Sequence, residues 1–255
     1  MKLIFFGTSG AVQTAQNVNV SFCIIYNESS ILVETSGNPI NYLLKSGINP
    51  VKLDAVVISH SHTDHIYALP SLIHNLWLLG RKEPLYILSN RQTIEIAKNM
   101  CENLSLFKKK NIFPIEWIEG NNNIIRIGDG RIKLFPVNHP VETSGFSFQL
   151  NDTRIVYSAD TSPIKKVIDE SNGADALIHE GTAPSTEEKN LNRDGHSSFR
   201  QAGEVAEQAG VKSLFICHFD GRIPLDHADI VSEVQKHYRG LIIIPELFKT
   251  YNLNN

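Results

Sequence analysis

The sequence predicts a mixed α/β protein with two facing sheets and helices on both outer faces, a four-layer αββα sandwich. Strands and helices alternate over residues 2–104 and again over 174–244, whereas residues 113–157 form a run of short strands separated by turns. Alternation is typical of strands backed by helices, and a run of short strands is typical of hairpins. No low-complexity linker divides the chain, so we expect a single domain over residues 1–255.

The first half of the chain is expected to form one sheet and its helices. Ile66, Leu69, Ile73 and Leu76 recur at three- and four-residue spacing, which is typical of one face of a helix, and Pro70 is tolerated in its first turn. The other expected elements are strands at 2–6, 21–26 and 30–34, a helix at 38–46 ended by Gly47, strands at 53–58 and 84–88, and a helix at 91–104.

The second half is expected to form the other sheet. Turn residues such as Gly128-Asp129-Gly130 separate its first strands, as hairpins require. The expected strands lie at 113–118, 123–127, 131–137, 146–150, 154–157, 174–178, 213–217 and 241–244, with helices at 197–209 and 226–238.

Composition and charge exclude several classes of protein. The formal net charge of −3 gives no global attraction for nucleic acid. No run of about 18 apolar residues is present, and the apolar stretch after Lys2 is too short for a signal peptide, so we expect a cytoplasmic protein without a membrane partner. The three cysteines are widely spaced and contain no Cys-x-x-Cys pair, so they indicate neither a disulfide framework nor a thiolate zinc site.

A cluster of metal-binding residue types follows the expected strand at 53–58. The stretch Ser59-His60-Ser61-His62-Thr63-Asp64-His65 places three imidazoles and a carboxylate within six residues, and these are natural ligands of zinc and similar ions. Alternation in extended chain directs His60 and His62 to the same side. Asp64 and His65 lie where the chain bends into a helix, so their side chains can bind at a second point. The stretch therefore predicts two metal ions.

Further ligands must then come from later in the chain. Three residues fit because each follows an apolar strand at the point where the strand leaves its sheet, and binding residues collect at such ends. These residues are His139, Asp160 and His218.

Read as His60-Ser-His62-Thr-Asp64-His65, the motif resembles the signature of the metallo-β-lactamase superfamily of binuclear hydrolases. The resemblance implies one metal held by His60, His62 and His139, and a second held by Asp64, His65 and His218, with Asp160 bridging the two. It implies no cysteine ligand, which argues against a β-lactamase proper and favours the phosphodiesterase and esterase branches. Cys217, which alternates away from His218, is expected in the core.

Two further stretches resemble motifs of ribonuclease Z, the tRNA 3′-end nuclease. They are His179-Glu180-Gly181-Thr182 and His196-Ser197-Ser198. The resemblance implies that Glu180 orients His196, which protonates the leaving oxygen, while Asp64 orients or deprotonates the nucleophile. The alternative is that Glu180 and His196 form a helix-capping or surface pair.

The chain departs from the nuclease family in one respect. That family carries a tRNA-clamping arm between the ligands that correspond to His139 and Asp160, and here only a hairpin fits between them. We therefore expect a small phosphodiester to be at least as good a substrate as an RNA 3′ end. The resemblance is also compatible with a homodimer.

The expected activity is that of a binuclear metal-dependent hydrolase, a phosphodiesterase with a metal-bridging hydroxide as nucleophile. The two divalent ions are expected to be zinc, with manganese or iron as alternatives, because nitrogen and oxygen ligands suit all three. Alternative functions are a lactone or thioester hydrolase, an iron oxidoreductase on the same fold, and a metal-binding sensor or subunit without turnover.

Overall fold

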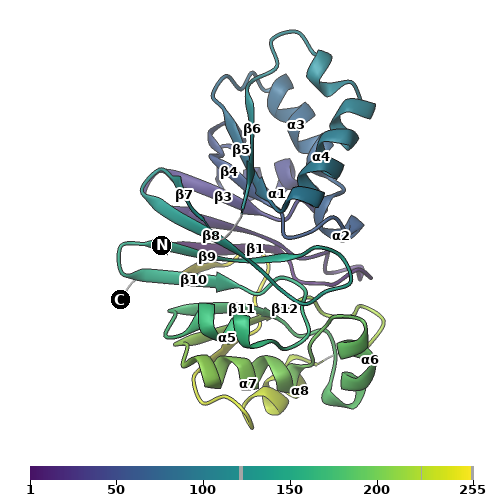
Figure 1. Cartoon of the computed structure of the whole chain (residues 1–255), viewed down its shortest axis with the longest axis vertical. Coiled ribbons are helices and arrows are strands. Elements are labelled where there is room, and N and C mark those ends of the chain that lie inside the picture. The colour runs from purple at the N-terminus through teal and green to yellow at the C-terminus, as the bar shows by residue number, and fades with distance from the viewer. Residues whose placement is uncertain (121–122, 225, 254–255) are drawn as a thin grey trace.

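The computed structural model describes residues 1–120, 123–224 and 226–253. Within these ranges, two seven-stranded sheets pack face to face, and helices cover the outer face of each (Figure 1). The four-layer αββα sandwich predicted from the sequence is confirmed.

The first sheet has the strand order β14-β1-β2-β3-β4-β5-β6. Its strands β3 to β6 run parallel to one another, whereas β14, β1, β2 and β3 pair antiparallel. The bounds are β1 Lys2–Gly7, β2 Ser21–Tyr26, β3 Ser29–Val33, β4 Ala55–Val57, β5 Leu85–Ser89, β6 Ile115–Glu119 and β14 Thr250–Asn252.

The second sheet repeats this plan with the order β13-β12-β11-β10-β9-β8-β7. Its strands β7 to β10 form antiparallel pairs, and β10 to β13 run parallel. The bounds are β7 Ile124–Ile127, β8 Gly130–Pro136, β9 Ser144–Leu150, β10 Thr153–Tyr157, β11 Ala176–Glu180, β12 Ser213–Cys217 and β13 Leu241–Ile243.

Helices occupy the two outer layers. In Figure 1, α1, α3 and α4 lie over the first sheet, and α5, α7 and α8 lie over the second. Their bounds are α1 Pro39–Lys45, α2 Thr63–Ile66, α3 Leu69–Leu78, α4 Arg91–Asn103, α5 Lys165–Ser171, α6 Glu188–Arg193, α7 Phe199–Ala209 and α8 His227–Val234, with short 3-10 turns at Pro50–Lys52, Leu106–Lys108 and Ser185–Glu187.

Alternation along the strands divides the apolar side chains between the layers. In β1, Leu3 and Phe5 point into the core between the sheets, whereas Ile4 and Phe6 pack under the helices of the first sheet. Phe5 contacts Phe22 of β2 and Phe215 of β12, with ring centroids 5.2 and 5.7 Å apart, and so joins the two sheets. Cys217 is buried in the same central core, as predicted.

Some elements differ from the prediction. The strand before the histidine motif spans only Ala55–Val57, so His60 and His62 lie in a loop and not in extended strand, whereas Asp64 and His65 lie in α2, at the expected bend into a helix. The first strand of the expected hairpin run, β6, pairs parallel with β5 and belongs to the first sheet. Helix α8 ends at Val234, before the expected residue 238. The sequence analysis did not anticipate α5, α6 or β14.

Candidate metal centre

The carboxyl ends of several strands meet at one edge of the sandwich. Parallel strands of a sheet end on the same side. Strand β8 shares the direction of β10, because both pair antiparallel with β9. The histidine motif follows β4, and residues 139, 160 and 218 follow β8, β10 and β12. All seven expected ligands therefore gather at this edge.

One group of imidazoles comes from both sheets. The ring centroids of His60 and His62 lie 4.7 Å apart, and each lies 4.9 Å from the ring of His139. Nε2 of His139 lies 3.1 Å from Nδ1 of His62. One nitrogen from each of these three residues falls within 4.8 Å of the others, a spacing that suits ligation of one metal ion.

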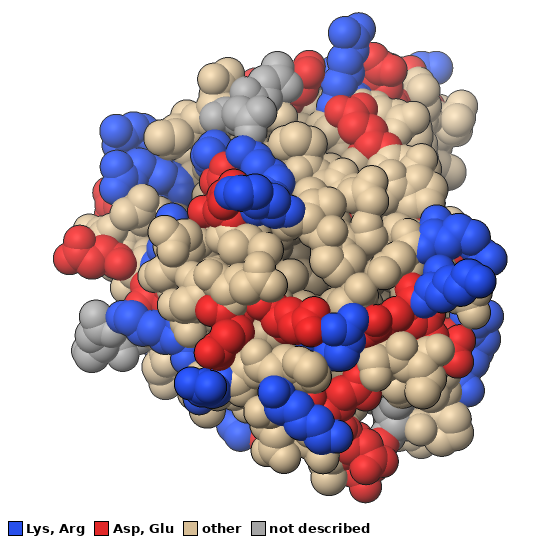
Figure 2. Space-filling model, turned by 60° about the horizontal axis from the view of Figure 1, so that its bottom comes forward, with Lys and Arg blue, Asp and Glu red and all other residues tan. Residues whose placement is uncertain are grey.

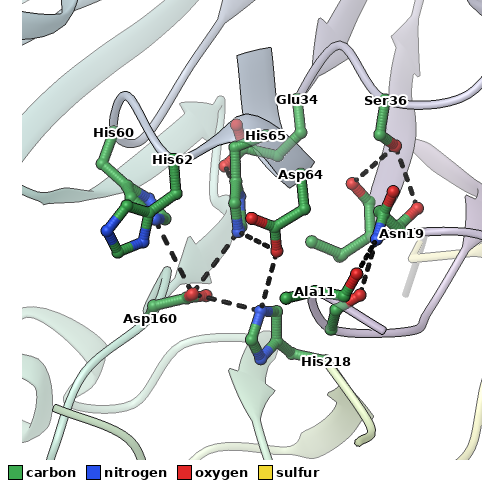
Figure 3. Close-up of polar contacts among 12 residues, drawn as sticks. Ala11, Asn19, Glu34, Ser36, His60, His62, Asp64, His65, Asp160 and His218 are labelled. Carbon is green, nitrogen blue, oxygen red and sulfur yellow. Dashed lines mark hydrogen bonds and ion pairs between the residues drawn. The ribbon is translucent and has the colours of Figure 1, made fainter. Parts of the chain in front are cut away.

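A second group lies next to the first (Figure 3). Oδ2 of Asp64 lies 3.3 Å from Nε2 of His65 and 3.6 Å from Nε2 of His218. These three residues also offer ligand atoms within 4.8 Å of one another.

The Asp160 carboxylate lies between the two groups. Its Oδ2 is 3.7 Å from Nε2 of His60, 3.4 Å from that of His65 and 3.1 Å from that of His218. Figure 3 shows it below the histidine motif and facing His218. A single oxygen thus addresses imidazoles of both groups.

The residues present fit a divalent metal. Five of their buried polar atoms make no hydrogen bond among the described residues. His65 Nδ1 faces Glu34, and the other four are His60 Nε2, His65 Nε2, His218 Nε2 and Asp160 Oδ1. A buried polar atom without a partner costs about 1–3 kcal/mol. Because the last four atoms converge on the same space and are borderline or hard donors, a cation such as Zn²⁺ would satisfy them together.

The pKa shifts also differ between the two groups of expected ligands. Burial lowers the pKa of His60, His62 and His139, which keeps these imidazoles neutral and available as ligands. Burial also acts to lower the pKa of His218, but the Asp160 carboxylate outweighs it and raises that pKa to about 10. The neighbouring imidazoles hold the pKa of Asp160 well below its usual range, against the effect of its burial. The carboxylates in and beside the second group therefore stabilise positive charge there.

Sequence reasoning missed Glu34, which follows β3 and is fully buried. Its carboxylate accepts hydrogen bonds from the Ser59 backbone N–H at 3.2 and 3.3 Å, and Oε1 lies 3.4 Å from Nδ1 of His65. A carboxylate behind a ligating histidine fixes the orientation of its ring. The available signal was an acidic residue directly after the apolar run 31–33.

Thr182, which the sequence analysis names only as part of the motif His179-Glu180-Gly181-Thr182, joins two parts of the site. Its hydroxyl donates to Oε2 of Glu180 at 2.7 Å and lies 3.3 Å from Nδ1 of His218. Gly10 packs against the same ring, because a Cβ there would lie 3.0 Å from Cε1 of His218. The threonine and the glycine loop both restrict the position of His218.

Glu180 and His196 form a pair beside the ligand cluster. Oε2 of the buried Glu180 lies 3.2 Å from Nδ1 of His196, and Oε1 accepts a hydrogen bond from the Thr161 backbone N–H. The N-cap of α7 is Ser198, in a capping box with Gln201, so neither member of the pair caps this helix. The Glu180 carboxylate outweighs burial and raises the pKa of His196.

A sequence profile described as the Beta-lactamase superfamily domain matches residues 35–219. The match covers more than half of the chain, and the chain therefore belongs to this superfamily, whose metallo-β-lactamase members the histidine motif resembles. No helix within the described ranges is long and apolar enough to cross a membrane.

Curated relatives and solved structures agree with this family. Ribonuclease BN of Escherichia coli strain K12 is 28% identical in an alignment that covers 87% of the chain and 90% of that enzyme. The metallo-β-lactamase fold protein YhfI from Bacillus subtilis has a TM-score of 0.83 at 22% identity, covering 98% of each chain. The short form of human tRNase Z has a TM-score of 0.82 at 18% identity, covering 100% of each chain. The predicted resemblance and the hydrolase class are confirmed.

Replacing Glu34 by Gln should weaken metal binding without unfolding the protein. The neutral amide removes the charge that faces His65, and loss of such a partner typically raises the metal dissociation constant about 10- to 100-fold. Competition with a chromogenic chelator measures this constant. The matched control is Glu95→Gln, which removes an exposed carboxylate from the Arg91 pair on α4. Equal affinity in Glu34→Gln and wild type, with circular dichroism unchanged, would contradict the role of Glu34.

Proposed function

We propose that this chain is a metal-dependent phosphodiesterase that holds two divalent ions, zinc in first place and manganese or iron as alternatives. His60, His62 and His139 would hold one ion, Asp64, His65 and His218 the other, and Asp160 would bridge them. The bound ions would supply Lewis acidity and neutralise charge on the phosphoryl oxygens. Similarity to ribonuclease BN and to the fold of tRNase Z supports this class of substrate.

The observation that carries the proposal is the position of His196. Its ring centroid lies 5.0 Å from that of His139 and 5.3 Å from that of His218, so it faces one member of each group. Glu180 occupies its Nδ1, which leaves Nε2 for a substrate. Because Glu180 also favours the protonated imidazole, His196 is suited to donate a proton to the leaving oxygen.

Asp64 is the candidate residue for orienting the attacking water. Its side chain is 13% exposed, and the neighbouring imidazoles His218 and His65 outweigh burial and hold its pKa far below the usual range. The ionised carboxylate accepts a hydrogen bond from the water but is a weak base, so the water, made acidic by the bound ions, would lose its proton to solvent. The water oxygen bonds to phosphorus, the bond to the leaving oxygen breaks, and the His196 proton goes to that oxygen.

The short interval between His139 and Asp160 supports a small substrate. It holds only the hairpin of β9 and β10, whereas the nuclease family carries its arm in this interval. Figure 2 shows basic and acidic side chains interspersed over one face of the molecule. Among the described residues, several lysines form ion pairs, among them Lys166 with Glu170 and Lys212 with Asp175. Nucleic-acid binding depends on free cations along the phosphate backbone, which these pairs do not supply.

The purified protein should hydrolyse bis(p-nitrophenyl) phosphate at least as readily as it removes the 3′ trailer of a precursor tRNA. The reason is that only a hairpin lies between His139 and Asp160, where the nuclease family carries its clamping arm. Comparison of kcat/KM for the two substrates tests this, with a lactone and a thioester as further substrates. Much faster tRNA processing with strongly salt-dependent binding would contradict it, and hydrolysis of the lactone or thioester alone would replace the proposed substrate class.

Replacing His196 by Ala should lower kcat by about 100- to 10,000-fold, the usual loss of a general acid, while metal content stays at the wild-type level. The loss should be smaller for p-nitrophenyl esters, whose leaving group needs little protonation. Glu180→Gln should give a smaller loss in the same direction. The matched control is His237→Ala, which removes another histidine that faces a glutamate, Glu204, at 3.5 Å.

Two results would contradict this role of His196. Loss of metal from the His196→Ala protein would make the residue a ligand. An unchanged kcat on every hydrolysed substrate would leave Glu180 and His196 as a structural pair.

A further inference from the structure

A cavity of about 640 Å³ opens beside His196. The loop at residues 10–12, helix α6 and the loop at residues 220–223 form its walls, and His196 and His218 line its inner end. Its volume falls in the usual range of small-molecule sites. Because His196 is the proposed proton donor to the leaving oxygen, the group that departs must lie on this side of the phosphorus.

Both arginines of the cavity are already paired. Nη2 and Nε of Arg222 lie 2.7 and 2.9 Å from the carboxylate oxygens of Asp220. Nε and Nη2 of Arg193 lie 2.8 and 3.1 Å from those of Asp194. In each pair a carboxylate engages two guanidinium nitrogens and offsets the positive charge that would otherwise attract a phosphate.

A third carboxylate, Glu187, also lines the cavity. Its carboxylate accepts a long hydrogen bond, 3.5 Å, from Nδ2 of Asn190. Apart from His196 and His218, the described lining carries two arginines and three carboxylates, whose charges sum to −1. A further phosphate on the leaving group that reaches this part of the cavity, away from the protonated His196, would meet repulsion there.

The uncharged part of the lining is also distinctive. The described residues that line the cavity include no Phe, Tyr or Trp, so they offer no aromatic side chain of the kind on which nucleobases usually stack. Instead, Thr182 and Asn190 offer hydrogen-bonding groups, and Ala11 and Leu191 offer small apolar surfaces. Hydroxyl groups on a carbon skeleton suit this combination, because carboxylates and amides accept their hydrogen bonds.

We propose that the enzyme acts on phosphodiesters whose leaving group is an uncharged, hydroxyl-rich alcohol such as glycerol or a sugar. The inference rests on the proposed function and names its substrate class. Water supplies the oxygen that bonds to phosphorus, the bond from phosphorus to the alcohol oxygen breaks, and His196 protonates that oxygen. The products are a phosphomonoester and the free alcohol.

Three substrates with alkyl leaving groups test the proposal. They are glycerophosphoglycerol, the dinucleotide ApA, and the same dinucleotide phosphorylated at both ends (pApAp), from which every leaving nucleoside carries a phosphate. We expect the highest kcat/KM for glycerophosphoglycerol, a lower value for ApA, and a further loss of about tenfold or more for pApAp, which should shrink at high salt because screening weakens repulsion. A preference for pApAp over the other two would overturn the proposal.

The Glu187→Gln variant tests the charge of the cavity while it keeps the shape of the cavity nearly unchanged. Removing this carboxylate should raise kcat/KM for pApAp about fivefold, the factor expected for one close charge contact in water, and should not raise it for glycerophosphoglycerol. The control is Glu95→Gln, on α4. Equal changes for both substrates would contradict an electrostatic role of the cavity.

Hydrolysis of bis(p-nitrophenyl) phosphate tests the proposed function separately from the leaving-group proposal. Hydrolysis of that compound together with a preference for pApAp contradicts the leaving-group proposal alone. No hydrolysis of any of the four compounds contradicts the proposed function and the inference that rests on it.

Discussion

The buried Asp160 carboxylate is the interaction on which the site depends. It is 2% exposed, and its Oδ2 lies within 3.7 Å of imidazole nitrogens from His60, His65 and His218. Burial of a carboxylate is costly unless opposite charge and hydrogen bonds compensate it. Here the compensation comes from residues that are themselves suited to bind metal. This arrangement is therefore well suited to bind metal, whereas a carboxylate that only filled space in the core would be costly to bury.

The sandwich makes this cluster possible by bringing the ends of its strands together. Glu34, Ala159 and His218 follow β3, β10 and β12, and all three have φ values between 55° and 65°. The left-handed region is unfavourable for residues other than glycine, by about 1–3 kcal/mol where the surrounding structure imposes it. The strained positions thus coincide with the edge at which the ligands meet. The left-handed backbone at these positions turns the chain out of each strand and directs Asp160 and His218 toward the histidine motif.

Much of the fold and site could be predicted because the signals are local. The apolar strands, the histidine motif and the single polar residues at 139, 160 and 218 are each visible within a few positions of the sequence. His60 and His62 do lie close together, but strand alternation does not extend to them, because β4 ends at Val57. Their proximity to each other and to His139 comes from the loop and from the second sheet.

The remaining features could not be predicted because they depend on contacts between distant segments. Glu34 acts on His65 thirty-one positions later, and Thr182 contacts His218 from a neighbouring strand end. The paired state of Arg193 and Arg222, which decides the charge of the cavity, is a matter of side-chain geometry. Helix α6, which forms one wall of that cavity, has only six residues and no apolar periodicity to mark it.

The central claim is that the two groups of ligands each hold a metal ion and share Asp160. Anomalous diffraction from crystals grown with zinc, recorded above and below the zinc absorption edge, tests it most directly. The account predicts two peaks per chain, one among His60, His62 and His139 and the other among Asp64, His65 and His218, with Asp160 between them. One peak only, or peaks away from these residues, would contradict it.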